Sequence, residues 1–295
     1  MPLVSVVMAN YNGEQYLASA LNSILAQSFI DFELIIVDDG SSDTSRDIIS
    51  QYARSDRRIR NVYMEHCGFV KALNYGCALS RGDFIARLDS DDIAKCDRLE
   101  AQVAFMIANP AIALVGGAIE CIDTDGKWLF SIRLPGRADG LHEYLLLDCH
   151  ISHSTVLLRK SVFEDVGGYR AVYQNAVDYD LFLRISDNHL VDNLPKILCQ
   201  YRLHPNQVSA YKGAQQIISG IGARLATRAR RAKRPEPTWK GEVVSREDLI
   251  REGISAERID SMIREYAECS SYSDGWRWKK AKSCELIFPS APEST

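Results

Sequence analysis

Short apolar runs alternate with helix-like segments through the first part of the chain. The apolar runs, rich in β-branched residues, occupy 3–9, 32–38, 59–65 and 83–88. Such runs are typical of strands buried on both faces of a sheet. The intervening segments 13–27, 42–54 and 68–80 space their apolar residues as helices do. Strands that alternate with crossover helices indicate a parallel sheet with right-handed connections, so we expect an α/β, Rossmann-like domain.

Polar residues follow three of these predicted strands. They occupy 10–12 after the first strand, 38–39 at the end of the second and 89–92 after the fourth. In open α/β sheets, ligands bind at the carboxyl ends of the strands. The three polar loops are therefore expected to meet at one cleft.

The stretch after the fourth strand is acidic, with Asp89, Asp91 and Asp92 inside four positions. Carboxylates this close repel and resist ionisation unless a positive charge is near. Asp89 and Asp91 lie on the same side of an extended chain, and Mg²⁺ commonly takes one or two carboxylates together with substrate phosphates. The alternative is a solvated turn that caps the following helix.

The remainder of the chain changes character near residue 211. Helices are expected over 98–110 and 176–187, and strands over 111–122, 128–134 and 196–202. A helix with a basic end, 215–237, two short amphipathic helices and a polar tail follow. We therefore expect one α/β domain over 1–210, with a mainly parallel sheet flanked by helices, and a helical extension over 211–295.

Composition narrows the class of protein. The formal net charge of −4 gives no global basic field for nucleic acid. No apolar run reaches the roughly 18 residues of a membrane span. The N-terminus lacks a basic region and a small-residue cleavage site, so no signal peptide is expected. The eight cysteines include no C-x-x-C pair, which favours reduced thiols and a cytoplasmic protein.

Several stretches together resemble the family 2 glycosyltransferases, inverting enzymes with the GT-A fold. They are "ANYNG", "VDDGSSD", "ARLDSDDI", "VDYDLFLR" and "YRLHPNQVS", and the resemblance covers about residues 3–210. It implies a UDP-sugar donor, with Mn²⁺ or Mg²⁺ as the cofactor. It also implies a nucleotide-sugar-binding half over 1–92 and an acceptor-binding half over 93–210.

The resemblance assigns roles to residues in each loop. It places Ala9, Asn10, Tyr11, Glu14 and Asp39 at the nucleoside, Lys71, Asn74, Asp89 and Ser90 at the rest of the donor, and Asp91 with His204 at the metal. An aromatic face can stack on a base and a carboxylate can accept its ring N–H. Asp92 is expected to bind the metal, orient the other two carboxylates or cap the next helix. His150 and His153 are expected to form structural hydrogen bonds.

Inverting transfer needs a base that takes the proton of the acceptor hydroxyl. The resemblance gives this role to Asp178, with Asp180 as the second acidic position. Val177 stands where the family usually has Glu, and the loss of that like charge should by itself lower the pKa of Asp178. The alternative is that Asp178 only favours the N-terminus of its helix through the dipole.

The expected activity is the transfer of one sugar from a UDP-sugar to a hydroxyl of a saccharide or lipid-linked saccharide. The chain lacks the Q-x-x-R-W of processive members, which favours single transfers. The family association suggests assembly of a surface polysaccharide or lipopolysaccharide. Two alternatives remain open here: a nucleotidyltransferase that releases pyrophosphate, and a degenerate protein that only binds a nucleotide or glycan.

A basic cluster marks the end of the helix near 224–234. Its members are Arg224, Arg228, Arg230, Arg231, Lys233 and Arg234. Such a cluster either lies on anionic lipid at the inner membrane face, close to a lipid-linked acceptor, or is a solvated helix end that favours the dipole.

Overall fold

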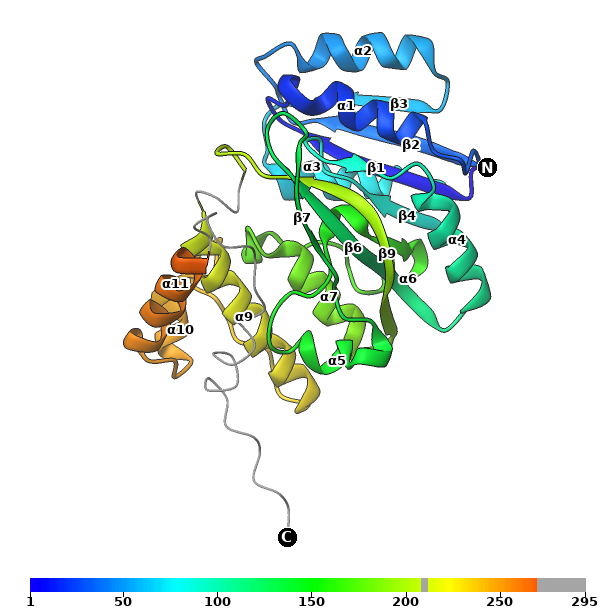
Figure 1. Ribbon diagram of the computed structural model, residues 1–295. Helices are drawn as coiled ribbons and strands as arrows, with labels where there is room; N and C mark the ends of the chain where they lie inside the picture. The colour runs from blue at the N-terminus through cyan, green and yellow to red at the C-terminus, as the bar shows by residue number, and fades with distance from the viewer. Residues whose placement is uncertain (208–211, 270–295) are drawn as a thin grey trace.

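The protein forms one mixed β-sheet with helices on both faces (Figure 1). The computed structural model describes residues 1–207 and 212–269. The sheet order is β3-β2-β1-β4-β8-β6-β9-β5, and β7 pairs with β6. The strands are β1 (Val4–Asn10), β2 (Phe32–Asp38), β3 (Ile59–Tyr63), β4 (Phe84–Arg87), β5 (Ile93–Ala94), β6 (Ile112–Ile122), β7 (Trp128–Ile132), β8 (Leu157–Arg159) and β9 (Leu190–Arg202).

The four predicted N-terminal strands are confirmed, and they pair in parallel. β1 lies between β2 and β4, with Asn10 beside Asp38 at the end of the β1–β2 register. β3 continues the order on the far side of β2. Because all four strands run the same way, their carboxyl ends share one edge of the sheet.

The sheet reverses direction after β4. β8 pairs antiparallel with both β4 and β6, whereas β9 runs parallel to β6. The strands predicted over 111–122 and 128–134 are present as β6 and β7 and pair antiparallel, and the short β5 pairs with β9. β5 follows the acidic loop directly, so this pairing brings that loop to the end of β9. The loop predicted after β9 lies partly outside the described residues, as does the polar tail.

Helices cover the two faces of the sheet over two apolar cores. Side chains from α1, α2 and α4 fill one core, and side chains from α3, α6, α7 and α9 fill the other. The helices are α1 (Glu14–Leu25), α2 (Ser45–Ser55), α3 (Phe69–Ala78), α4 (Arg98–Ala108), α5 (Leu141–Tyr144), α6 (Lys160–Asp165), α7 (Val177–Asn188), α9 (Gly213–Arg231), α10 (Arg246–Arg251) and α11 (Ala256–Cys269). The 3₁₀ turns are η1 (Arg137–Asp139), η2 (His153–Thr155) and η3 (Ala171–Tyr173).

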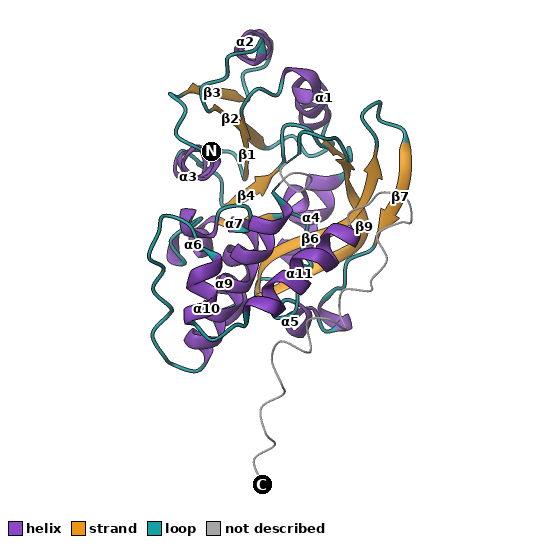
Figure 2. Ribbon diagram, turned by 90° about the vertical axis from the view of Figure 1, so that its left-hand side faces the viewer, coloured by secondary structure: helices purple, strands orange, loops and turns teal. Residues whose placement is uncertain are grey.

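The described part of the C-terminal extension is helical, as predicted, and packs beside α7. Figure 2 shows α9, α10 and α11 together on this side of the molecule. Ile218 and Ile221 of α9 belong to the same buried cluster as Tyr179 and Phe182 of α7. The extension therefore completes the core beneath α7. The division of 1–210 into donor and acceptor halves stays a prediction.

The basic cluster at the end of α9 is largely engaged within the protein. Arg230 and Arg231 each place Nε 2.7 Å from the carboxylate of Asp187, and Arg230 also pairs with Glu236 at 2.9 Å. Arg224 is buried and donates to the carbonyl oxygen of Leu147. These contacts hold α9 against α7 and its surroundings. Among the described residues, no helix has both the length and the hydropathy to span a bilayer.

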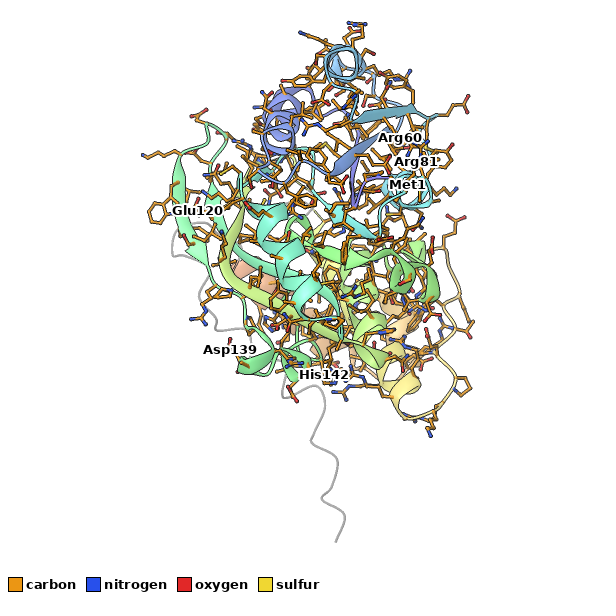
Figure 3. The ribbon with its side chains drawn as sticks, turned by 90° about the vertical axis from the view of Figure 1, so that its right-hand side faces the viewer. Met1, Arg60, Arg81, Glu120, Asp139 and His142 are labelled. Atoms are coloured by element: carbon orange, nitrogen blue, oxygen red, sulfur yellow. The ribbon has the colours of Figure 1, made fainter. Side chains whose placement is uncertain are left out.

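Glu33 is a buried carboxylate at the amino end of the sheet, opposite the loops that follow β1, β2 and β4. Glu33 accepts from Ser5 Oγ at 2.7 Å and from the backbone N–H of Arg81 at 2.8 Å. Arg60 pairs with its other oxygen at 2.7 Å. Figure 3 shows Arg60, Arg81 and Met1 close together on this side. The guanidinium and hydrogen bonds hold the pKa of Glu33 below its ordinary value although burial opposes this.

The close approach of α3 to the sheet yields a test of packing. A Cβ at Gly76 would lie 2.7 Å from Val7 Cγ1 and 3.1 Å from Val37 Cγ2. Branched side chains have few alternative rotamers, so Gly76→Ala should lower the free energy of unfolding by about 1–3 kcal/mol. Urea denaturation measures this change.

Gly220→Ala is the matched control, since Gly220 also lies inside a helix. Its added Cβ would make an ordinary contact, 3.7 Å from the ring of Tyr179. Alanine favours helix by about 1 kcal/mol over glycine, so stability should stay constant or rise. If both variants lowered the free energy of unfolding equally, the close packing of α3 on the sheet would be contradicted.

Candidate active site

The loops at the carboxyl ends of β1, β2 and β4 meet, as the parallel topology requires. Asp39 N–H donates to the carbonyl oxygen of Asn10 at 2.8 Å, and Asn10 Nδ2 donates to Asp38 Oδ1 at 3.1 Å. A Cβ at Gly13 would lie 2.2 Å from Asn10 Oδ1 and 3.3 Å from Ser90 Oγ. The chain at Gly13 thus fits between the first and the fourth strand ends.

Asp39 lies at the base of the predicted nucleoside site and organises the turn before α3. Its carboxylate accepts from the backbone N–H groups of Cys67 at 2.8 Å and Gly68 at 3.0 Å. His66 Nδ1 lies 3.1 Å from the same carboxylate. The half-exposed ring of Tyr11 stacks on His66, with the ring centroids 4.3 Å apart. The half-exposed ring of Tyr11 and the buried carboxylate of Asp39 therefore both contact His66.

Other residues predicted to touch the donor have structural partners instead. Glu14 accepts from Thr44 N–H at 2.9 Å and from its hydroxyl at 2.6 Å, which ties α1 to the start of α2. Asn74 donates to the carbonyl oxygen of Tyr169 at 2.8 Å and accepts from its N–H at 3.0 Å. Ala9 is buried in the core. The predicted contacts of these three residues with the donor stay predictions.

Lys71 remains exposed on α3, one turn from Asn74. It lies close enough to Cys67 for its charge to favour the thiolate, although burial and Asp39 raise the pKa of Cys67 overall. Lys71 is therefore placed beside the turn that Asp39 organises. Its predicted contact with the donor stays a prediction.

The acidic loop contains three carboxylates in three different environments. Asp89 pairs with the buried guanidinium of Arg87 and accepts from Ser154 Oγ at 2.9 Å. Burial opposes ionisation of Asp89, but Arg87, His153 and Ser154 together lower its pKa. Asp89 is thus held as an anion at the end of β4.

Asp91 and Asp92 contact the end of β9. Asp91 Oδ2 lies 2.9 Å from His204 Nε2, which joins the two predicted metal ligands. Asp92 is fully buried, and its Oδ1 accepts from Arg202 N–H at 2.8 Å. Its Oδ2 is buried, and no described residue forms a hydrogen bond with it. Burial, reinforced by Asp91 and Asp89, raises the pKa of Asp92 well above its ordinary value.

Asp178 stands at the N-terminus of α7, within electrostatic reach of Asp89. Burial, reinforced by the charge of Asp89, raises its pKa to about 6, against the hydrogen bond from Tyr179 N–H and the charge of Arg87. Val177 packs into the core beside it. Removing the family's usual Glu therefore does not leave a lowered pKa, because burial outweighs the lost repulsion.

Asp180 is only two residues further along α7 but lies outside the cleft. It is fully buried and binds two guanidinium groups. Arg170 donates to both of its oxygens, through Nε at 3.0 Å and through Nη2, and Arg184 Nε donates at 3.0 Å. Arg184 also donates to the carbonyl oxygen of Gly168 at 2.5 Å. Asp180 thus holds the "GGYR" turn against α7.

Around the acidic loop, Arg87, Arg98 and Phe69 were not predicted from the sequence, whereas His153 was expected to form a structural hydrogen bond. Arg87 and Arg98 are among the largest fully buried side chains of the described residues. His153 Nε2 lies 2.8 Å from the hydroxyl of Tyr169, and burial lowers the pKa of His153 to about 3, so its ring is neutral. Phe69 is exposed beside this group and lies under the guanidinium of Arg87 at 5.5 Å. The position of Arg87 inside the apolar run "IARL" could have indicated a buried charge that needs an acidic partner.

The sequence of this chain is similar to those of known glycosyltransferases. The chain matches the model of the family described as Glycosyl transferase family 2 over residues 5–167. It is 32% identical over 216 residues to the UDP-Glc:alpha-D-GlcNAc-diphosphoundecaprenol beta-1,3-glucosyltransferase WfgD of Escherichia coli, covering 71% of this chain and 81% of that protein.

Solved structures with low sequence identity share the fold. S. aureus TarS in complex with UDP-GlcNAc superposes with a TM-score of 0.58 at 18% identity, covering 88% of this chain and 77% of TarS. The mannosyltransferase PcManGT from Pyrobaculum calidifontis, in complex with GDP-Man and Mn²⁺, gives 0.60 at 17% identity, covering 92% and 76%. The protein is a glycosyltransferase with the GT-A fold. It belongs to glycosyltransferase family 2, which confirms the predicted fold and family.

The contrast between Asp178 and Asp180 yields a test of their roles. Asp180→Asn would leave Arg170 and Arg184 with an uncharged partner. Removing one member of a buried ion pair costs about 3–5 kcal/mol, so the free energy of unfolding should fall by that order at pH 8. Chemical denaturation followed by circular dichroism measures it.

Asp178→Asn is the control for this measurement. The pKa of Asp178 is raised on folding, so its contribution to stability falls as the pH rises through the interval up to about 6 and stays low above it. At pH 8 the neutral amide should leave stability unchanged or increase it. A larger loss for Asp178→Asn than for Asp180→Asn would reverse these roles.

Proposed function

We propose that this protein is an inverting glycosyltransferase that moves one sugar from a UDP-sugar to a hydroxyl of a saccharide or lipid-linked saccharide. The observation that carries the proposal is the position of Asp178, a carboxylate with a raised pKa beside the acidic strand-end loop. Family membership favours a transferase over a nucleotidyltransferase or a pure binding protein. The UDP-Glc named for WfgD and the UDP-GlcNAc bound to TarS support a uridine nucleotide.

The nucleoside is proposed to bind between Tyr11 and Asp39. The exposed ring of Tyr11 offers a stacking face. Asp39 already accepts two backbone N–H groups, and each carboxylate oxygen has a second lone pair for a ring N–H of the base. Asn10 is buried behind them and holds the two loops together, which is a positioning role.

The residues at the acidic loop fit a divalent cation that is shared with the donor. Among the described residues, no group of three or more His, Cys, Asp or Glu side chains is arranged to hold a metal alone. Asp91 and His204 supply one carboxylate and one imidazole 2.9 Å apart, a donor set that suits Mn²⁺ or Mg²⁺ when diphosphate oxygens complete the shell. A bound cation there supplies positive charge to the leaving diphosphate.

Asp178 is proposed to take the proton of the acceptor hydroxyl. A general base works best when its pKa lies near the operating pH, and a value of about 6 meets this condition while leaving the group ionised at neutral pH. The half-buried position of Asp178 and the negative charge of Asp89 nearby both act to raise this pKa. Assembly of a surface polysaccharide is proposed as the context, since the relative WfgD acts on a diphosphoundecaprenol-linked sugar.

A cytoplasmic setting is proposed from the thiols. The cysteines that the structure describes, Cys67, Cys77, Cys96, Cys121, Cys149 and Cys199, are all free, as expected where thiols stay reduced. The basic end of α9 is a weak candidate for lipid contact, because Arg224, Arg230 and Arg231 already bind partners within the protein.

UDP release from a panel of UDP-sugars tests the donor and the cation together. UDP release should depend on Mn²⁺ or Mg²⁺ and should stop with EDTA. It should fall about 100-fold or more in Asp91→Ala, because Asp91, His204 and the diphosphate are proposed to share one cation. Calorimetry with UDP separates binding from turnover when no acceptor is present. Absence of nucleotide binding to the wild type would overturn the proposed donor.

The pH dependence of transfer tests the base. With donor saturating, kcat/KM for the acceptor should fall about tenfold per pH unit below about 6, because protonated Asp178 cannot accept a proton. Asp178→Asn should lower kcat by about 10²–10⁴-fold and remove this acidic limb, while UDP affinity stays at the wild-type value. A variant that keeps the rate and the acidic limb would show that another group is the base.

A further inference from the structure

Arg202, the last residue of β9, joins the segments that carry the proposed metal ligands. Its backbone N–H donates to Asp92 Oδ1 at 2.8 Å, and its Nε donates to the carbonyl oxygen of Asp91 at 3.0 Å. Nη1 donates to the carbonyl oxygens of Asp123 at 3.1 Å and Thr124 at 3.2 Å, in the turn between β6 and β7. Arg202 therefore connects the acidic loop, the end of β9 and the β6–β7 turn.

An aromatic ring extends this connection to the second ligand. The guanidinium of Arg202 lies over the ring of Tyr16, 4.5 Å from its centroid. The other neighbour of that ring is His204, at a centroid distance of 5.1 Å. Both Arg202 and Tyr16 are buried. The imidazole of His204 thus packs on a ring that Arg202 covers, while its Nε2 meets Asp91.

We propose that Arg202 is a positioning residue that holds Asp91 and His204 together as one ligand pair for the divalent cation of the donor complex. The inference rests on the proposed metal assignment. Asp91 and His204 are 113 positions apart in sequence, so local chain geometry does not align them. The planar fork of arginine reaches several carbonyl oxygens at once, which the single ammonium of lysine cannot do.

The test compares Arg202→Lys with Arg159→Lys. Arg159 makes the same kinds of contact at the other end of the sheet: it donates to the carbonyl oxygens of Ile112 and Met106, both at 2.9 Å, and covers the ring of Phe84 at 5.3 Å. Mn²⁺ binding in the presence of UDP is measured from the electron paramagnetic resonance of free Mn²⁺. Thermal unfolding is measured for each variant.

Arg202→Lys should weaken Mn²⁺ binding by about 10- to 100-fold, the usual effect of losing a partner that orients a ligand. UDP release by this variant should recover at high Mn²⁺. Arg159→Lys should lose comparable thermal stability with unchanged Mn²⁺ affinity. Unchanged Mn²⁺ affinity in Arg202→Lys, or equal weakening in both variants, would overturn the inference.

Tyr16 gives a second pair of variants that leaves Arg202 in place. Tyr16→Leu removes the ring shared by Arg202 and His204 and should weaken Mn²⁺ binding, whereas Tyr16→Phe keeps the ring and the affinity. Equal Mn²⁺ affinity in these two variants would contradict the inference even if Arg202→Lys does not fold. If wild type and Asp91→Ala bind Mn²⁺ alike, the metal assignment itself fails, and the inference fails with it.

Discussion

Charge compensation at the end of β4 is the constraint on which the site depends. Three carboxylates within four positions repel one another, and burial adds to the free energy of ionising them. The buried guanidinium of Arg87 pairs with Asp89 and keeps it anionic. Burial and the charges of Asp91 and Asp89 instead raise the pKa of Asp92. The loop therefore combines one fixed negative charge with one group that favours its protonated form.

The same physical contrast separates the two acids of α7. Asp178 has a carboxylate neighbour and a buried position, so its pKa is raised to about 6. Asp180 faces two guanidinium groups and serves as a structural anchor. The two residues are chemically identical but two positions apart, so they face different sides of α7. Their different roles follow from the groups that each one meets there. Pairs of this kind illustrate how environment assigns acid and base roles.

The sequence predicted much of the fold because its periodicity is strong. Buried parallel strands read as continuous apolar runs, and β1, β2 and β4 lie within a residue or two of their predicted ranges. The antiparallel insertion of β8 between β4 and β6 was not predicted. Strand order depends on pairing between segments far apart in sequence, and apolar periodicity carries no information about the partner. The helical extension was predicted, but its packing beneath α7 was not.

For the site, the sequence by itself determined which polar residues stand at the carboxyl ends of the strands, since parallel topology brings those ends together. Tertiary structure decided which hydrogen-bond partners each of these residues has within the protein. Glu14 and Asn74, both predicted to contact the donor, also form hydrogen bonds with Thr44 and Tyr169. The pairing of Asp91 with His204 likewise arises from the fold. Hydrogen-bond partners and burial are set by contacts distant in sequence, and these contacts decide charge, pKa and access to a ligand.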